Sequence, residues 1–148
     1  MMKRVCFITG IVVAAALGCV TVAQGAQIAG TTSGECFDIP HGVVADGSPV
    51  NQFHCHGSPN EQWTIGNGQI SGLGGSCLDI MGSAPAEGAQ IIIVACNGRA
   101  SQKWSVSQGQ IIGLGGKCID VTGGSTQDGA PLILATCNSS PSQQWSLQ

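Results

Sequence analysis

A pattern of 41 residues occurs three times in this chain, and no other feature constrains the fold as strongly. Cys36, Cys77 and Cys118 are 41 residues apart, and the same interval separates further cysteines, aspartates, glycines and tryptophans. These further sets are Asp38, Asp79 and Asp120; Gly47, Gly88 and Gly129; Cys55, Cys96 and Cys137; and Trp63, Trp104 and Trp145. No insertion or deletion interrupts the copies, so they represent three equivalent structural units.

Each unit consists of short apolar runs separated by turn residues. In the third unit these runs lie at 110–114, 117–121, 131–137 and 143–147. Glycine pairs and polar stretches between the runs are typical of turns between β-strands. The pattern therefore predicts an all-β fold with about twelve short strands. Three copies favour closure about a threefold axis, because an open array would need caps and would leave strand edges exposed.

Residues 1–25 have the pattern of a cleaved secretory signal peptide. Lys3 and Arg4 precede an uncharged stretch over 5–23, and the small residues Ala23 and Gly25 suit a cleavage site. We predict that the remaining domain, residues 27–148, is secreted to the extracellular space or the periplasm. Without the leader it carries three basic and eight acidic residues, a net charge of −5. This balance argues against nucleic acid as a partner, and we expect no membrane insertion of the mature domain.

Six cysteines remain after the leader, one pair in each unit. The two members of a pair are 19 residues apart, and the simplest connectivity joins Cys36–Cys55, Cys77–Cys96 and Cys118–Cys137. The stretch His54-Cys55-His56 suggests a metal site instead. That alternative is weak, because the repeat assigns Cys55 to a pair and its strand neighbours point to opposite faces. We therefore expect no metal and no cofactor.

These motifs resemble the repeat of the ricin B-type lectin domain, also classed as carbohydrate-binding module family 13. The resemblance covers residues 27–148 and rests on Cys-x-Asp-Ile/Val near the start of a unit and Gln-x-Trp at its end. The matching segments are 77–80 with 102–104, and 118–121 with 143–145. The first unit keeps Cys36-Phe37-Asp38-Ile39 but has Glu61 in place of the glutamine. The resemblance implies a β-trefoil with one disulfide per repeat and the three tryptophans in its core.

The resemblance also implies one possible sugar pocket per repeat, and the first repeat has the residues for it. Asp38 takes the family's carboxylate position and Asn51 its amide position. Phe53 faces the same side as Asn51 by strand alternation and is expected to cover the apolar face of a sugar ring. His56 and Asn60 match polar positions that contact sugar in family members.

The other two repeats lack this set of side chains. The second has Ile92, Val94, Asn97 and Ser101 at these positions, and the third has Ile133, Ala135, Asn138 and Ser142. Asp79 and Asp120 are therefore expected to hold turns through backbone hydrogen bonds. Two points stay open: His41 either rims the pocket or is solvated, and Glu61 either is neutral or removes an amide donor that orders Asn60.

Taken together, the sequence predicts a secreted carbohydrate-binding lectin with one main pocket in the first repeat. Galactose- and xylose-type glycans or polysaccharides are the expected ligands. We do not expect an enzyme, because there is no serine nucleophile motif and the acids follow the scaffold instead of forming a catalytic pair. The alternative is a non-catalytic β-trefoil for protein interaction or inhibition, with a degenerate sugar site.

Overall fold

Short β-strands joined by tight turns make up the described part of the chain, which covers residues 2–6, 19–23 and 25–148. This computed structural model contains no α-helix within those ranges, and eight single turns of 3-10 helix occur between strands. Thirteen strands lie between residues 28 and 147, because the two-residue strand β5 (Ser48–Pro49) adds to the expected twelve. The others are β3 (Ile28–Gly30), β4 (Glu35–Asp38), β6 (Asn51–His54), β7 (Thr64–Gly66), β8 (Gln69–Ser71), β9 (Cys77–Ile80), β10 (Ile91–Val94), β11 (Ser105–Ser107), β12 (Gln110–Ile112), β13 (Cys118–Val121), β14 (Leu132–Ala135) and β15 (Trp145–Leu147).

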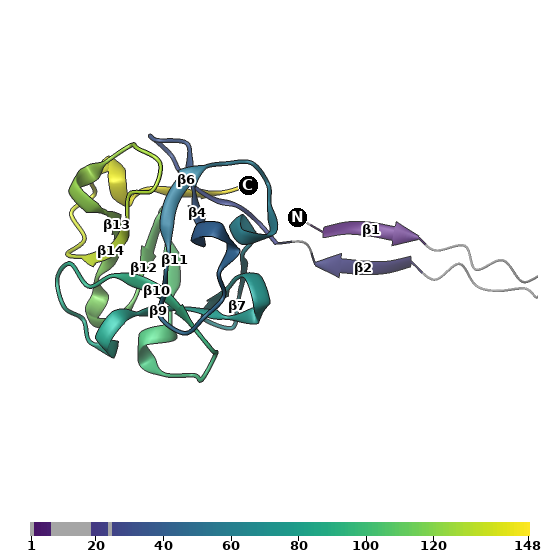
Figure 1. Cartoon of the computed structure of the whole chain (residues 1–148), viewed down its shortest axis with the longest axis horizontal. Helices are drawn as coiled ribbons and strands as arrows, with labels where there is room; N and C mark the ends of the chain where they lie inside the picture. The colour runs from purple at the N-terminus through teal and green to yellow at the C-terminus, as the bar shows by residue number, and fades with distance from the viewer. Residues whose placement is uncertain (1, 7–18, 24) are drawn as a thin grey trace, which may run out of the picture.

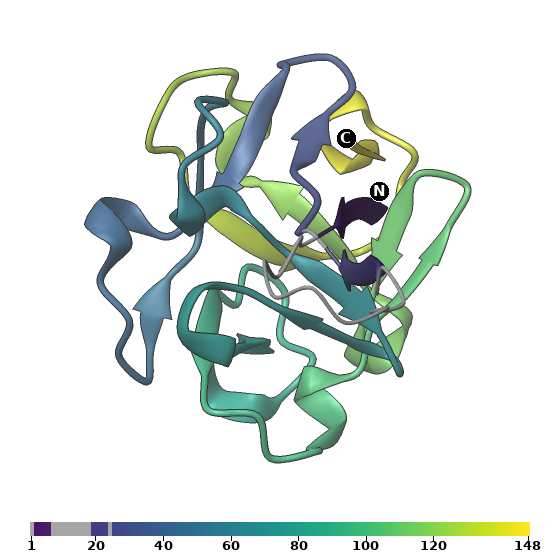
Figure 2. The ribbon, with the colours of Figure 1, turned by 90° about the vertical axis from the view of Figure 1, so that its right-hand side faces the viewer.

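The strands form three sheets, each of which joins the last strand of one repeat to the first three strands of the next. The orders are β15-β3-β4-β6, β7-β8-β9-β10 with β5 at its edge, and β11-β12-β13-β14. Pairing of β15 with β3 closes the ring, because it joins the end of the third repeat to the start of the first. Figure 2 shows the resulting lobes around a common centre. The predicted all-β trefoil of three 41-residue repeats is confirmed.

The N-terminal segment forms an antiparallel strand pair, β1 (Met2–Cys6) with β2 (Cys19–Ala23). In Figure 1 this pair lies outside the trefoil. The rest of the predicted signal peptide lies outside the described residues, so cleavage and secretion stay predictions. Among the described residues, no helix has the length and apolar character needed to cross a membrane.

The three tryptophans lie in the core, as predicted. Trp63, Trp104 and Trp145 are at most 6% exposed. Each indole N–H donates to a backbone carbonyl of its own repeat, at 2.9 to 3.1 Å. The Trp104 ring lies so close to Gly113 that a Cβ there would be 2.5 Å from it. Glycine is therefore required at that position for packing.

The three predicted disulfides are confirmed, each within one repeat. Cys36–Cys55, Cys77–Cys96 and Cys118–Cys137 have Cα–Cα distances of 5.2, 4.9 and 5.0 Å. In each repeat the bond ties the second strand to the segment after the third strand. In the chain-entropy model a loop of this size contributes about 3 kcal/mol per disulfide.

A carboxylate at one position of every repeat connects that repeat to the next one in the ring. The acid accepts a backbone N–H of the neighbouring repeat, in the pairs Asp46 with Ala95 (2.8 Å), Glu87 with Thr136 (2.9 Å) and Asp128 with His54 (2.8 Å). The three acids directly precede the repeating glycines and are also 41 residues apart. We did not single out this repeating position from the sequence, although the spacing was visible there.

Candidate functional site

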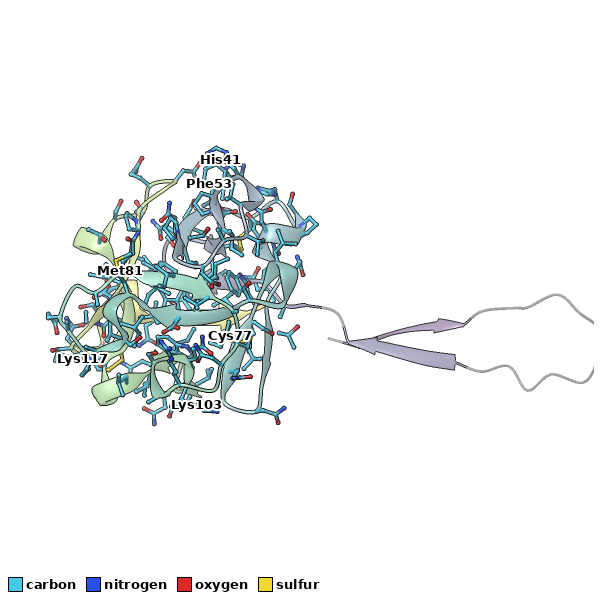
Figure 3. The ribbon with its side chains drawn as sticks, turned by 60° about the horizontal axis from the view of Figure 1, so that its bottom comes forward. His41, Phe53, Cys77, Met81, Lys103 and Lys117 are labelled. Carbon is cyan, nitrogen blue, oxygen red and sulfur yellow. A yellow bond between two sulfur atoms is a disulfide. The ribbon has the colours of Figure 1, made fainter. Side chains whose placement is uncertain are left out.

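A pocket opens at the first repeat, and all five residues predicted to bind sugar line it. Its volume is about 350 Å³. The lining residues are Asp38, Pro40, His41, Asn51, Phe53, His56, Asn60 and Gly129. Gly129 belongs to the third repeat, so the pocket lies where the first and third repeats meet. His41, left open by the sequence, also lines it, and Figure 3 shows His41 beside Phe53 at one edge of the domain.

The hairpin of β4 and β6 positions three of these side chains. Asp38 is paired with Asn51 in the strand register, at the end of the hairpin. Phe53 follows Asn51 by two residues and lines the same pocket, as strand alternation predicts. Its ring is half-buried and lies with its centroid 6.0 Å from that of His56. Phe53 is therefore not part of the closed core, and its ring reaches the pocket.

Asp38 is a buried carboxylate whose only hydrogen-bond donor among residues 25–148 is a side chain of the same pocket. The residue is 5% exposed, and its Oδ1 accepts Nδ2 of Asn60 at 2.6 Å. The same Asn60 amide also donates to the carbonyl of Ile39 at 3.1 Å, which fixes its orientation. Burial raises the pKa of Asp38, and the negative charge of Glu61 raises it further.

In the other repeats the equivalent aspartates are bonded to the scaffold through both oxygens. One oxygen of Asp79 accepts the N–H of Ile80 at 2.7 Å, and the other accepts Nε2 of Gln102 at 3.0 Å. Asp120 has the same two bonds, to the N–H of Val121 and to Gln143. This is the structural role expected for these two aspartates, and it leaves little of either carboxylate for a ligand.

Asp38 differs for two reasons: the N–H of Ile39 donates to the carbonyl of Asn60 at 3.0 Å, and Glu61 replaces the glutamine. A carboxylate cannot donate the hydrogen bond that Gln102 gives to Asp79. Instead, Glu61 is fully buried and its Oε2 accepts three N–H groups at 2.9 Å, from the Gln27 side chain and from the backbones of His56 and Gly57. The glutamine amide that the first repeat lacks would therefore have donated to Asp38. It is not a donor that orders Asn60.

The His56 ring is held between two oxygen atoms. Its Nδ1 lies 2.7 Å from Oγ of Ser58, and its Nε2 lies 3.1 Å from Oε1 of Glu61. The second contact lacks the alignment of a hydrogen bond, and Oε1 of Glu61 is buried without a hydrogen-bond donor. One donor atom each of Asp38, His56 and Glu61 lie within 4.8 Å of one another.

The positions equivalent to His56 have a local role in the other repeats. Oδ1 of Asn97 accepts the N–H of Arg99, and Oδ1 of Asn138 accepts the N–H of Ser140, both at 3.0 Å. The residues equivalent to Asn51 and Phe53 are aliphatic there, as the sequence shows. Neither repeat therefore assembles the polar and aromatic groups that meet in the first.

A second titratable cluster lies beside the pocket and was not predicted. His54 donates its backbone N–H to Asp128, and its ring Nδ1 lies 2.9 Å from Oδ2 of the same residue. Glu35 is opposite His54 in the β4–β6 register, and its carboxyl group faces that of Asp128. Desolvation and the neighbouring Asp128 carboxylate raise the pKa of Glu35 to about 7, whereas the hydrogen bond to Asp128 raises the pKa of His54.

Comparison with known proteins gives one family match, which covers most of the chain. The model of the ricin-type beta-trefoil lectin domain matches residues 24–145.

Three similar solved structures share the trefoil. The designed threefold-symmetric protein ThreeFoil is 28% identical with a TM-score of 0.76, over 82% of this chain and 96% of that one. The exo-β-1,3-galactanase 1,3Gal43A from Clostridium thermocellum is 26% identical with a TM-score of 0.76, over 85% of this chain and 30% of the enzyme. A non-toxic homologue of type II RIPs from Momordica charantia (bitter gourd), solved with α-methyl-D-galactoside, is 25% identical with a TM-score of 0.72, over 82% of this chain and 46% of that one.

Proposed function

Since this chain belongs to the ricin-type beta-trefoil lectin family, we propose that it binds galactose-type glycans through the pocket of its first repeat. A domain of this family is generally a carbohydrate-binding module without catalytic activity. The observation that carries the proposal is the state of Asp38, which is the one repeating aspartate not bonded to a glutamine of its own repeat.

The polar groups of the pocket suit the hydroxyl groups of a pyranose. Asp38 accepts a single hydrogen bond from Asn60, so it has lone pairs left for sugar hydroxyls. Oδ1 of Asn51 has no hydrogen-bond donor and Asn51 lines the same pocket, so its amide is a second group for a sugar hydroxyl. Since water already satisfies sugar hydroxyls in solution, such preformed acceptors are needed for any net gain.

Phe53 supplies the apolar part of the contact. One face of a pyranose presents C–H groups, and an aromatic ring covers this face well. The ring edge of His56 packs near Phe53 and limits the positions that Phe53 can adopt. Fixing the ring before binding reduces the entropy that a ligand would otherwise have to overcome.

Galactose is preferred over xylose as the first sugar to test. The bitter gourd homologue was solved with α-methyl-D-galactoside, and the clostridial relative is named as a β-1,3-galactanase. A single shallow pocket of this kind binds with a dissociation constant of about 1 mM, or about −4 kcal/mol. A polymer with repeated galactose units would raise the apparent affinity through multivalency when several copies bind it.

Titration of the disulfide-intact protein with galactose, lactose and xylo-oligosaccharides tests the proposal. We expect saturable binding of the galactosides, which Asp38→Asn and Phe53→Ala each weaken at least tenfold. The matched controls are Asp79→Asn and Val94→Ala, which change the equivalent positions of the second repeat and should leave binding intact. Equal loss in both repeats contradicts the single-pocket proposal, and binding of xylo-oligosaccharides alone contradicts the choice of sugar.

We also propose that the domain functions outside the cytoplasm. Three disulfides hold the fold, and such bonds persist in oxidising compartments. The basic start and uncharged stretch of residues 1–25 support export. N-terminal sequencing of the protein recovered from the medium or periplasm tests this: a start near residue 26 agrees, and an intact Met1 in the cytoplasmic fraction contradicts it.

A further inference from the structure

We propose that Asp38, His56 and Glu61 bind a divalent transition-metal cation of the Zn²⁺ type at the floor of the pocket. Their donor atoms all lie within 4.8 Å of one another. The set joins one imidazole nitrogen to two carboxylate oxygens, which is a ligand combination that Zn²⁺ accepts in proteins. The sequence did not predict it, because only His54 and Cys55 were considered as partners of His56 there.

The buried oxygen of Glu61 is the observation that points to a cation. Glu61 is fully buried, yet its Oε1 has no hydrogen-bond donor. Nε2 of His56 lies 3.1 Å from this oxygen, without hydrogen-bond alignment. A buried carboxylate oxygen without a donor is costly, and a bound cation would remove that cost.

Each of the three side chains is held through its other polar atom. Oε2 of Glu61 accepts three N–H groups, and Oδ1 of Asp38 accepts the Asn60 amide. Nδ1 of His56 lies 2.7 Å from Oγ of Ser58, and this hydroxyl can accept a hydrogen bond from Nδ1 when the ring carries its proton there, as metal binding requires. The lone pair of Nε2 is then available. Hydrogen bonds of this kind orient the ligands of natural metal sites.

Ligand distances require the three donor atoms, which lie within 4.8 Å of one another, to move closer together. Zn²⁺ is bound at about 2.0 to 2.2 Å by nitrogen and oxygen, so tetrahedral ligand atoms are about 3.4 Å apart. The 3.1 Å between His56 and Glu61 already fits, and the His56 side chain is 35% exposed and free to turn. Three protein ligands leave one position for water. Asp38 and His56 both line the pocket, so this position faces its interior.

Calorimetric titration of the untagged, disulfide-intact chain with ZnCl₂, in the absence of any sugar, tests the inference. We expect one Zn²⁺ per chain, with Ca²⁺ and Mg²⁺ bound at least tenfold more weakly because both prefer all-oxygen sites. Glu61→Gln and His56→Asn should each weaken Zn²⁺ binding at least tenfold. Glu61→Gln introduces the residue that the other two repeats carry, so this variant is expected to fold.

The matched control is His54→Asn, which removes a neighbouring histidine that is bonded to Asp128. It should leave Zn²⁺ binding unchanged. Absence of Zn²⁺ binding by the unmodified chain overturns the inference, as does undiminished binding by folded Glu61→Gln. Because no glycan is present, this failure is distinguishable from failure of the proposed lectin function.

Discussion

The first repeat and the other two share one scaffold, but they differ in what their buried acid is bonded to. Asp79 and Asp120 each accept a backbone N–H and a glutamine amide. Asp38 accepts only the Asn60 amide, since Glu61 stands where the other repeats have glutamine and the N–H of Ile39 donates to the carbonyl of Asn60. The same position can therefore stabilise the second and third repeats and remain available for a ligand in the first.

Glu61 shows how this change is accommodated. Its Oε2 accepts the N–H of His56, just as Oε1 of Gln102 accepts the N–H of Asn97. The turn after the third strand is thus held in both cases. The two bonds from the glutamine amide, to the aspartate and to the carbonyl of Ala95, have no equivalent in the first repeat. There the N–H of Ile39 also donates to the carbonyl of Asn60 and not to Asp38, so the substitution goes with a local change of backbone bonding.

Transferring the change to the second repeat is expected to have the largest effect on stability. Gln102→Glu removes the donor to Asp79 and to the carbonyl of Ala95, and it buries a second carboxylate beside the first. We expect a loss of about 3 kcal/mol in the free energy of unfolding. Urea denaturation of the disulfide-intact protein at pH 7 measures it.

The reverse change is the control for this experiment. Glu61→Gln restores the pattern of the other repeats, so we expect it to alter the free energy of unfolding by less than about 1 kcal/mol. Equal effects of the two substitutions would show that the glutamine amide contributes nothing specific. The difference between the first repeat and the other two would then arise from other residues.

Removing the acids themselves should separate stability from binding. Asp79→Ala leaves the buried N–H of Ile80 without its acceptor and is expected to cost about 2 kcal/mol. Asp38→Ala removes a buried charge near Glu61 and is expected to change stability by less than about 0.5 kcal/mol. For galactoside affinity we expect the opposite order, in which Asp38→Ala weakens binding and Asp79→Ala does not. Chemical denaturation and sugar titration of the same two samples check both halves.

The sequence predicted most of the fold because the repeat determines it. The period of 41 aligns the cysteine pairs, so the simplest disulfide pairing followed from the spacing. The core position of the tryptophans and the pocket roles of Asp38 and Asn51 followed from the resemblance to the ricin B-type lectin repeat. Strand alternation then placed Phe53 on the same side as Asn51.

Contacts between repeats were not predictable in the same way. Within the first repeat, the bond from Gln27 to Glu61 was not predictable either, because Gln27 lies outside the repeating positions. Glu35 and Asp128 meet only because the third repeat folds back on the first. The acid at positions 46, 87 and 128 does repeat, but its acceptor role depends on the ring closure.

One position facing this inter-repeat acid carries different chemistry in each repeat. Glu35, Ser76 and Lys117 occupy equivalent places. Lys117 forms an ion pair with Glu87 at 2.7 Å, and this interaction lowers the pKa of Glu87 to about 2. Glu35 instead faces the carboxylate of Asp128, and desolvation together with this neighbouring acid raises its pKa to about 7. The interface between the first and third repeats is thus the one at which two acids face each other.

The smallest of the expected effects is a pH dependence of stability that arises at this interface between the first and third repeats. Glu35 ordinarily has a pKa of 4.5, and its value of about 7 in the folded protein means that folding favours the protonated form. Stability is therefore greatest below pH 4.5 with respect to this group and falls as pH rises through 7. The raised pKa of His54 acts in the same direction. Allowing for solvent screening of a partly exposed group, we expect Glu35 to account for a loss of about 1 kcal/mol between pH 5 and pH 8. Urea denaturation across this range measures it.

Glu35→Gln should flatten the profile of stability against pH. Glu35→Lys, which copies Lys117, should flatten it and also raise stability at pH 8. A profile unchanged in both variants would assign the pH dependence to other groups. It would also remove the contrast between the Glu35–Asp128 and Lys117–Glu87 contacts.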